Sequence, residues 1–304
     1  MGVGVGGRSE GYLSRRMLGL YMLLAWLSVA YCLNPPDGTS RGTFDQLFQI
    51  TWAPDHVQTS NGDTQVKLTL DQVNTSSFAS KGKYQFGYLS TGIKLIPRDS
   101  AGTVTAYYLA SDTGNTRDEL DFEFLGNSSG QPYTLQTNIF ANGIGRREQR
   151  IYLWFDPSAD FHNYAVLWNK KQIVFYVDDY PIRIFENKES EGIAFPTSRP
   201  MGIFASLWNG DSWATQGGAV KLNWTYAPFE ASFGSFDIQA CDATSGSNCA
   251  SGDGWWSAAE YQSLGQADIS KLKWVQQNYM IYDYCTDTLR YAQPPPDCVK
   301  LSGM

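Results

Sequence analysis

Hydrophobic and polar residues alternate along several stretches of the chain between residues 64 and 140. Alternation with a period of two is typical of β-strands, because successive side chains of a strand point to opposite faces of a sheet. Clusters of Gly, Asn, Asp and Pro separate the alternating stretches, as expected for turns. The predicted strands are TQVKLTL (64–70), GYLSTGIKLI (87–96), TVTAYYLA (103–110), ELDFEFLG (119–126) and YTLQTNIF (133–140).

The segment FHNYAVLWNKKQIVFYVDDYPIRIFEN (161–187) predicts three further strands. Tight turns at Asn169–Lys171 and Asp178–Pro181 would join them. No long helical pattern interrupts the predicted strands. A chain with this many strands and so little helix is expected to form an all-β sandwich or jelly roll.

The composition changes near residue 236, and the loop-forming stretch ATSGSNCASGDG (243–254) follows. We therefore divide the mature chain into a main domain, residues 31–235, and a small C-terminal extension, residues 236–304, which we expect to pack on the main domain. Apolar residues recur at near-helical spacing within the extension, which predicts one short helix followed by an extended segment. These residues are Ile269, Leu272, Val275 and Tyr279.

The N-terminus has the pattern of a secretory signal peptide. Arg8, Arg15 and Arg16 precede the apolar run MLGLYMLLAWLSVA (17–30), which is too short for a comfortable membrane span. Small residues at its end form a cleavage site after residue 30. We predict that residues 1–30 are removed and that the mature protein is secreted without a membrane anchor; an uncleaved signal anchor is the alternative.

Cysteine usage agrees with export. Cys32 lies near the predicted cleavage site, and the four remaining cysteines allow three pairings. Short loops favour Cys241 with Cys249 and Cys285 with Cys298. Neither spacing is that of a zinc site, and with only two histidines in the chain we predict no metal and no Ser-His-Asp catalysis.

The charge and the size of the chain limit the classes of molecule that it is expected to bind. The chain has 304 residues, is 42% hydrophobic and carries a formal net charge of −7. An acidic protein without a basic run does not bind nucleic acid well. A neutral polymer suits such a surface better.

Three carboxylates occupy every second position of NTRDELDFEFLGN (115–127), and on a strand they share one face. The outer two are roughly 13 Å apart at their Cα atoms, at about 3.3 Å per residue. Side chains leaning together reach the separation of about 5–5.5 Å that a retaining glycosidase requires. The three acids are Glu119, Asp121 and Glu123.

Two other interpretations of these acids exist. A solvated outer face is the common origin of such alternation, but neighbouring like charges repel, so an idle surface would intersperse Lys. A calcium site also collects carboxylates, but this stretch lacks the spacing of a calcium loop. Catalysis is the interpretation that fits best.

The stretch DELDFEFLGN resembles the active-site strand of the plant xyloglucan endotransglucosylase/hydrolases, within glycoside hydrolase family 16. Four further segments carry the same likeness: FDQLFQITWAPDH, TNIFANGIGRREQRIYLWFDPSADFH, SLWNGDSWAT and WVQQNYMIYDYCTDTLR. The resemblance implies a concanavalin-like β-jelly-roll with a concave substrate cleft and a C-terminal extension. It also implies retaining chemistry on xylose-bearing β-1,4-glucan and no cofactor.

The resemblance assigns a role to each acid. By position, Glu119 is the nucleophile, Glu123 the general acid/base, and Asp121 assists Glu119, in our interpretation through a hydrogen bond. An acid/base needs a raised pKa, and crowding of carboxylates supplies one.

Other positions match the cleft residues of that family. For each Trp the structural alternative is core packing, and for Gln136 and Asn138 it is a hydrogen-bonded core amide. Asn127, in the stretch GNSSG, matches the family's usual glycan position. The positions that match substrate-binding residues are Tyr108, Gln136, Asn138, Arg150, Trp208, Trp213, Tyr282 and Arg290.

One position departs from the resemblance. The family usually has His two residues before the nucleophile, and this chain has Arg117. Residues 117 and 119 share a strand face, so a fixed positive charge lies near Glu119 and favours its ionised form.

The resemblance implies that the protein cuts xyloglucan and rejoins it to another xyloglucan chain or oligosaccharide in the plant cell wall, the apoplast. The segment SLWNGDSWATQGGAVKLNWTYAPFEASF (206–233) lacks the extended loop of hydrolytic relatives, so we predict that transfer dominates over hydrolysis. Trp208, Arg150 and Arg290 are the candidates for holding the acceptor, and we expect a monomer. The alternatives are an endohydrolase of xyloglucan or mixed-linkage glucan, and a lectin-like carbohydrate-binding module.

Overall fold

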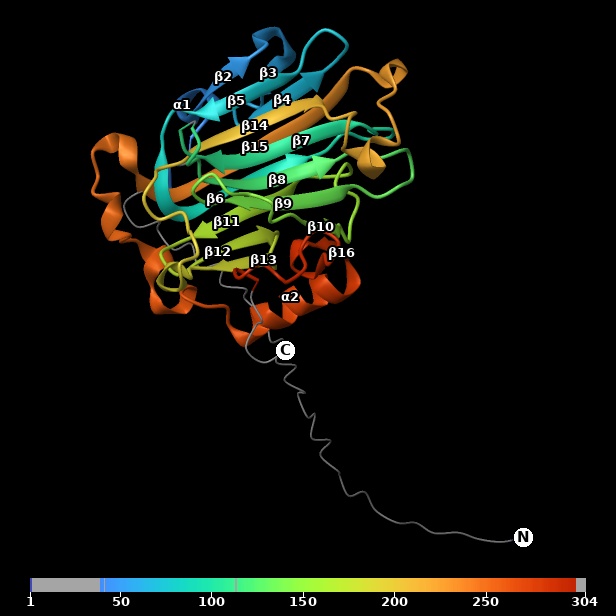
Figure 1. Ribbon diagram of the computed structural model, residues 1–304. Helices are drawn as coiled ribbons and strands as arrows, with labels where there is room; N and C mark the ends of the chain where they lie inside the picture. The colour runs from blue at the N-terminus through green and yellow to red at the C-terminus, as the bar shows by residue number, and fades with distance from the viewer. Residues whose placement is uncertain (2–38, 41, 113, 299–304) are drawn as a thin grey trace. The chain divides into compact units, whose positions relative to one another are not determined.

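The computed structural model describes residues 1, 39–40, 42–112 and 114–298. The predicted signal peptide (apart from Met1), its cleavage site and Cys32 lie outside these residues. Two large antiparallel sheets, packed face to face, account for most of the described chain (Figure 1). No helix among the described residues has the length and apolar character needed to cross a membrane.

The first sheet contains the three-stranded meander predicted at residues 161–187. Its strands run in the order β13 (Tyr180–Glu186), β12 (Gln172–Val177), β11 (His162–Trp168), β6 (Tyr84–Lys94), β15 (Phe229–Asp242), β4 (Gln65–Leu70) and β3 (Val57–Ser60), with β1 (Thr39–Ser40) paired to β15.

The second sheet contains the acidic strand at its centre. Its order is β16 (Met280–Asp283), β10 (Gln149–Tyr152), β9 (Thr134–Phe140), β8 (Glu119–Leu125), β7 (Thr103–Ala110), β14 (Gly202–Asn209), β5 (Ser76–Ser80) and β2 (Phe48–Trp52).

Helices are few and short. Within the residues that the structure describes, the α-helices are α1 (Phe44–Leu47) and α2 (Gln266–Asn278). The 3-10 turns are η1 (Pro54–His56), η2 (Glu189–Glu191), η3 (Thr215–Gly218), η4 (Trp224–Tyr226), η5 (Ala243–Ser245), η6 (Cys249–Ser251), η7 (Trp255–Ser257), η8 (Ala259–Tyr261) and η9 (Tyr284–Thr286).

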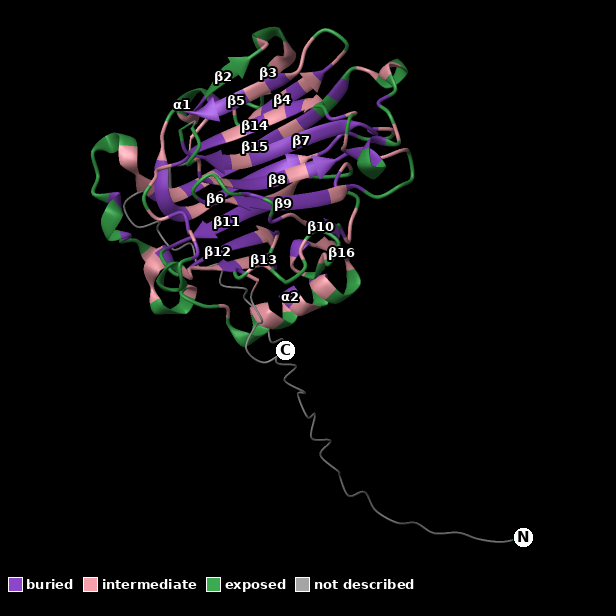
Figure 2. Cartoon of the chain, viewed as in Figure 1, coloured by how far each residue is buried: buried purple, intermediate pink, exposed green. Residues whose placement is uncertain are grey.

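The core lies between the two sheets. On β8, Leu120, Phe122 and Phe124 are fully buried. The ring of Phe122 meets Phe175 edge-on at 5.1 Å, and Phe124 meets Tyr164 at 4.7 Å, both across the sandwich. Figure 2 shows this burial along the central strands of the sheet. The alternation of β8 therefore places its apolar side chains in the core and its acids on the opposite face, as predicted.

The sequence prediction of an all-β sandwich is confirmed, and each predicted strand is present. The predicted helix is α2, with Leu272 and Val275 buried. The extended segment predicted after the helix contains β16, whereas the sequence pattern did not reveal β2, β5 and β10, which have only four or five residues each. Short strands give too few alternations to stand out.

The predicted domain boundary at 235/236 falls inside β15, which continues to Asp242 as an interior strand of the first sheet. Beyond it, disulfides join Cys241 to Cys249 and Cys285 to Cys298, the pairs that the short loops favour. The extension is thus attached to the sandwich by a continuous strand and contributes β16 to the second sheet.

Candidate active site

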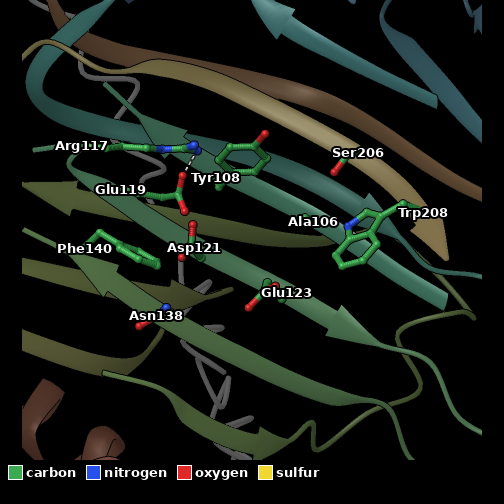
Figure 3. Close-up of a pocket in the computed structure, with 10 residues that line it drawn as sticks. All are labelled: Ala106, Tyr108, Arg117, Glu119, Asp121, Glu123, Asn138, Phe140, Ser206 and Trp208. Carbon is green, nitrogen blue, oxygen red and sulfur yellow. Dashed lines mark ion pairs between the residues drawn. The ribbon is translucent and has the colours of Figure 1, made fainter. Parts of the chain in front are cut away.

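The three acids of β8 lie on the outer face of the second sheet, in a cleft of about 310 Å³ (Figure 3). The three acids face this cleft because Leu120 and Phe122, on the opposite face of the strand, pack in the core. Figure 3 shows the three carboxyls in sequence along the strand. The residues that line the cleft are Ala106, Tyr108, Arg117, Glu119, Asp121, Glu123, Asn138, Phe140, Ser206 and Trp208.

Glu119 is held by a cation. The guanidinium of Arg117 forms an ion pair with its carboxylate, and both side chains are largely shielded from solvent. The same guanidinium lies 5.9 Å from the ring centroid of Tyr108, within the range of a cation–π contact. A fixed positive charge in contact with a carboxylate favours the ionised form, which is the form that a nucleophile requires.

Asp121 is the most deeply buried of the three acids, with 6% of its surface exposed. Burial raises its pKa well above the usual range, and the charge of Glu123 adds to this, while Arg117 and Arg183 act in the opposite direction. The hydrogen bond from Asp121 to Glu119 stays a prediction. The guanidinium of Arg117 already contacts one oxygen of the Glu119 carboxylate.

Glu123 has a neutral partner. The side-chain amide of Gln136 donates to Oε2 of Glu123 at 2.6 Å, and Oε1 of Gln136 accepts from Nε of Arg150 at 2.7 Å. Burial raises the pKa of Glu123, the Gln136 hydrogen bond and Arg150 lower it, and Glu148 raises it, with a net upward shift. A buried carboxyl with a raised pKa can hold a proton to donate to a leaving oxygen.

The partners of Glu123 continue in register across three strands. Glu123 lies opposite Gln136 on β9, Gln136 opposite Arg150 on β10, and Arg150 opposite Tyr282 on β16. The guanidinium of Arg150 lies 5.4 Å from the ring centroid of Tyr282. A line of polar and aromatic side chains therefore leads from Glu123 to the C-terminal extension.

Arg290 lies at the end of this line. Its Nη1 donates to Oε2 of Glu148 at 2.5 Å and to the Tyr282 hydroxyl at 3.3 Å. The Tyr282 hydroxyl in turn donates to Asp287 at 2.8 Å. The extension thus places two predicted substrate-binding residues, Tyr282 and Arg290, beside the sheet.

The structure places the two predicted tryptophans differently. Trp208, on β14, lines the cleft, whereas Trp213 packs against Trp208 with ring centroids 6.1 Å apart. Both contact the small apolar cluster of Val104, Leu125 and Ala214. Trp213 is partly exposed and packs beside Trp208 at this wall of the cleft, and its role in substrate binding stays a prediction.

Trp208 and the two predicted acceptor arginines lie on opposite sides of β8. Trp208 is on β14, two strands from β8 in one direction, and Arg150 is on β10, two strands away in the other. Of these three predicted acceptor residues, Arg150 and Arg290 lie together at the C-terminal extension, and Trp208 lies apart from them.

Two predicted side chains have internal partners. Asn138 is 7% exposed, and its Oδ1 accepts hydrogen bonds from the backbone N–H groups of Ile139 and Arg147. These bonds partly agree with the alternative interpretation of Asn138 as an amide that is hydrogen-bonded within the protein. Asn127 follows β8, and its amide nitrogen donates to the carbonyl of Pro132 at 3.0 Å. One amide hydrogen of Asn127 remains for a glycan to replace.

Sequence analysis missed several cleft residues. Phe140 has the same strand parity as Gln136 and Asn138, and Ala106 has that of Tyr108, so alternation alone could have indicated both. Ser206 could have been found the same way from Trp208. Glu148, the partner of Arg290, could not, because 142 residues separate the two in sequence.

Metal binding has no visible support in the described part of the chain. No group of three or more His, Cys, Asp or Glu side chains there is arranged to hold a metal ion.

Comparison with family models gives two matches. Residues 44–226 match glycosyl hydrolases family 16, and residues 250–298 match the C-terminus of xyloglucan endo-transglycosylase. The first match covers most strands of the two sheets, including the acidic strand, and the second covers the part of the extension that carries α2 and Tyr282.

Named relatives resemble the chain over most of its length. The probable xyloglucan endotransglucosylase/hydrolase protein 6 of Arabidopsis thaliana is 53% identical, covering 84% of this chain and 88% of that protein. The xyloglucan endotransglucosylase/hydrolase protein A of Phaseolus angularis is 50% identical, covering 92% of this chain and 96% of that protein.

Solved structures share the fold at lower identity. The Crh5 transglycosylase in complex with NAG superimposes with a TM-score of 0.55 at 21% identity, covering 68% of this chain and 86% of that one. The Bacillus licheniformis beta-glucanase gives a TM-score of 0.51 at 24% identity, covering 66% of this chain and 90% of that one. These two likenesses concern the fold alone.

Proposed function

The chain belongs to glycosyl hydrolases family 16, and we propose that it cuts the β-1,4-glucan backbone of xyloglucan with retention and joins the cut chain to a second xyloglucan chain. The observation that carries the proposal is the pair of differently held glutamates on β8, one beside a cation and one beside an amide. The matched C-terminal segment and the names of the relatives support xyloglucan as the polymer.

In the first step, the Glu119 carboxylate attacks the anomeric carbon of the sugar at the cleavage point. The bond from that carbon to the glycosidic oxygen breaks, and Glu123 gives its proton to the departing oxygen. The leaving half of the polymer acquires a hydroxyl, and the other half is held as an ester of Glu119. Arg117 then faces a neutral ester instead of a carboxylate.

In the second step, a hydroxyl of the acceptor chain gives its proton to Glu123 while its oxygen attacks the same carbon. The ester bond breaks, and Glu119 leaves as a carboxylate again. Arg117 stabilises that departing charge. The two steps together break one glycosidic bond and form another, so no cofactor or energy source is needed.

Water competes with the acceptor in the second step. Transfer dominates when binding positions the sugar hydroxyl better than water is positioned, and effective-molarity gains are large enough for this. Arg150, Tyr282 and Arg290, which lead from Glu123 to the extension, are the groups that we assign to acceptor binding. Trp208 would contact sugar on the other side of β8.

The experiment measures both outcomes at once. Purified protein is given xyloglucan polymer and a labelled xyloglucan oligosaccharide at saturating concentration, and label in polymer is counted against new reducing ends. We expect label to be incorporated well ahead of reducing ends. Reducing ends that accumulate as fast as label would identify a hydrolase instead.

We also propose that the protein acts as a secreted monomer in the plant cell wall. The motivation is the predicted signal peptide at residues 1–30, the two disulfides and the sequon at Asn127. Expression of the full chain with a C-terminal tag tests this: we expect a secreted, glycosidase-sensitive protein, and retention inside the cell would contradict it.

A further inference from the structure

Trp52 is an exposed aromatic side chain at the end of β2, the edge strand of the sheet that carries the cleft. Its side chain has 59% of its surface exposed, and it takes part in no ring pairing among the described residues. The neighbouring strand of β2 is fully integrated into the sandwich, since Phe78 of β5 is buried against Phe44 and Phe48. An indole left in solvent on such an ordered strand needs a reason.

The register of the sheet connects Trp52 with the catalytic strand. Glu123 lies opposite Ala106 on β7, and Ala106 lies opposite Ser206 on β14. Ser206 lies opposite Ser77 on β5, and Ser77 lies opposite Trp52 on β2. One transverse row thus crosses four strand spacings from the acid/base to the exposed indole, roughly 19 Å at about 4.8 Å per strand.

A bulge brings Trp52 to the cleft face. In a regular strand Trp52 would share the core face of Phe48, but the register shifts between Ile50 and Trp52, so that Thr51 and Trp52 both lie opposite Ser77. Ser77 faces outward, because its neighbours Ser76 and Phe78 are buried. The 2.8 Å hydrogen bond between the hydroxyls of Thr51 and Ser77 fixes this pair on the outer face.

The row between the acid and the indole leaves room for a ligand. Ala106 and Ser206 already line the cleft, and their side chains are short. An extended β-1,4-glucan lying across the strands advances by about one sugar for each strand spacing. A chain held at Glu123 would therefore place its fourth or fifth sugar over Trp52, and the flat face of a pyranose ring packs well on an indole.

We propose that Trp52 is a remote sugar-binding platform for the donor, the part of the polymer that remains attached to Glu119. This rests on the proposed function and names the half of the cleft, β7 to β2, that holds the donor. The other half, β9 to β16, is the half that we assign to the acceptor. The enzyme would then gain affinity from donors long enough to reach β2 and none from shorter ones.

The test is a donor-length series with three variants. Wild type, Trp52→Ala, Trp52→Phe and Ile50→Ala are compared on xyloglucan oligosaccharides of increasing backbone length at saturating labelled acceptor. Ile50 is the matched control, since it lies opposite Phe78 on the same edge strand, just before the bulge. We expect Trp52→Ala to lower kcat/KM about tenfold on long donors, equivalent to about 1.4 kcal/mol, and to leave short donors unchanged.

We expect Trp52→Phe to recover most of the length dependence and Ile50→Ala to behave as wild type. An equal loss on short and long donors, or the same loss in Ile50→Ala, would overturn the platform, because both indicate a general disturbance of β2. Wild type without activity on xyloglucan would instead reject the proposed function. In that case, retardation in gels that contain soluble β-1,4-glucan decides the platform, and equal mobility of wild type and Trp52→Ala overturns it.

Discussion

The two ends of β8 carry the same residue type in different surroundings. At one end Glu119 is in contact with the guanidinium of Arg117, and at the other Glu123 accepts from the neutral amide of Gln136. The two glutamates are four positions apart in sequence and lie on one face of one strand. The charged partner favours a carboxylate, and burial beside a neutral partner favours a carboxylic acid. We propose that environment, rather than residue identity, divides the work between nucleophile and acid/base.

Removal of the Glu119 carboxylate should have the largest effect. We expect Glu119→Ala to lower transfer by at least about a thousandfold, because no covalent intermediate can form. The fold should persist, since the side chain lies on the outer face of the sheet, as a thermal melt would verify. Substantial turnover by Glu119→Ala would mean that the two ends of β8 have been assigned the wrong roles.

Removal of the Glu123 carboxyl should be nearly as severe on polymer, with a loss of about a hundred- to ten-thousandfold. Unlike Glu119→Ala, the variant retains its nucleophile, so a small anion such as azide should restore turnover of an activated aryl donor. The product would be a glycosyl azide. Rescue of Glu119→Ala under the same conditions, with Glu123→Ala unaffected, would reverse the assignment.

Replacement of Arg117 by Gln should weaken the contrast between the two ends. Without the guanidinium the ionised form of Glu119 is less favoured, so the acid limb of the pH–rate profile should move to higher pH. We expect about a tenfold loss of activity at acidic pH, and less at neutral pH. The profile of kcat/KM decides this, and an acid limb that stays in place would show that the ion pair does not set it.

The basic limb of the pH–rate profile should depend on the surroundings of Glu123, at the other end of β8. Gln136 lowers the pKa of Glu123 by donating to it, so Gln136→Leu should raise that pKa further. The acid/base then keeps its proton to higher pH, and the basic limb moves up. Thr134→Val, two residues earlier on the same face of β9, is the control and should leave the limb in place. A downward shift in Gln136→Leu would contradict the account.

The smallest effect is expected between the two ends, at Asp121. Its pKa is raised in the folded protein. Above about pH 3.9 the unfolded chain releases the carboxyl proton of Asp121, whereas the folded protein still keeps it. The contribution of Asp121 to the free energy of unfolding is fully present below that pH, and it falls as the pH rises toward the pKa of Asp121 in the folded protein.

Asp121→Asn should therefore raise Tm at neutral pH by a few degrees and leave it unchanged at low pH, as calorimetry would measure. Asp118→Asn is the contrast, because it loses the ion pair with Arg199 and should lower Tm at neutral pH. A lower Tm for Asp121→Asn at neutral pH would mean that the carboxylate is stabilising there.

The sequence predicted best where alternation separates two chemically distinct faces. Strands β8 and β9 follow this rule, and so the three acids and their shared face could be foreseen. It failed at β15, where the apolar phase set by Phe229 and Phe233 changes after Ser235, a residue with φ of 50° at a register shift. We placed the boundary at 235/236 on the change in composition near residue 236, and β15 continues across it.

Long-range pairing limited the prediction of the site. That Trp208 lines the cleft and Trp213 packs beside it depends on how the loop after β14 folds back, which the stretch SLWNGDSWAT does not encode locally. The Arg290–Glu148 pair and the register that links Glu123 to Tyr282 likewise arise from the assembled sheet. The order of these side chains across the strands was not indicated by the sequence.

The covalent intermediate tests the central claim most directly. Glu123→Ala, given a xyloglucan oligosaccharide with an activated aryl leaving group, can complete the first step without its acid but lacks the base for the second. We predict that mass spectrometry of its peptides will find the oligosaccharide esterified to Glu119. An adduct on Asp121 or another residue, or aryl release without any adduct on the protein, would contradict the account.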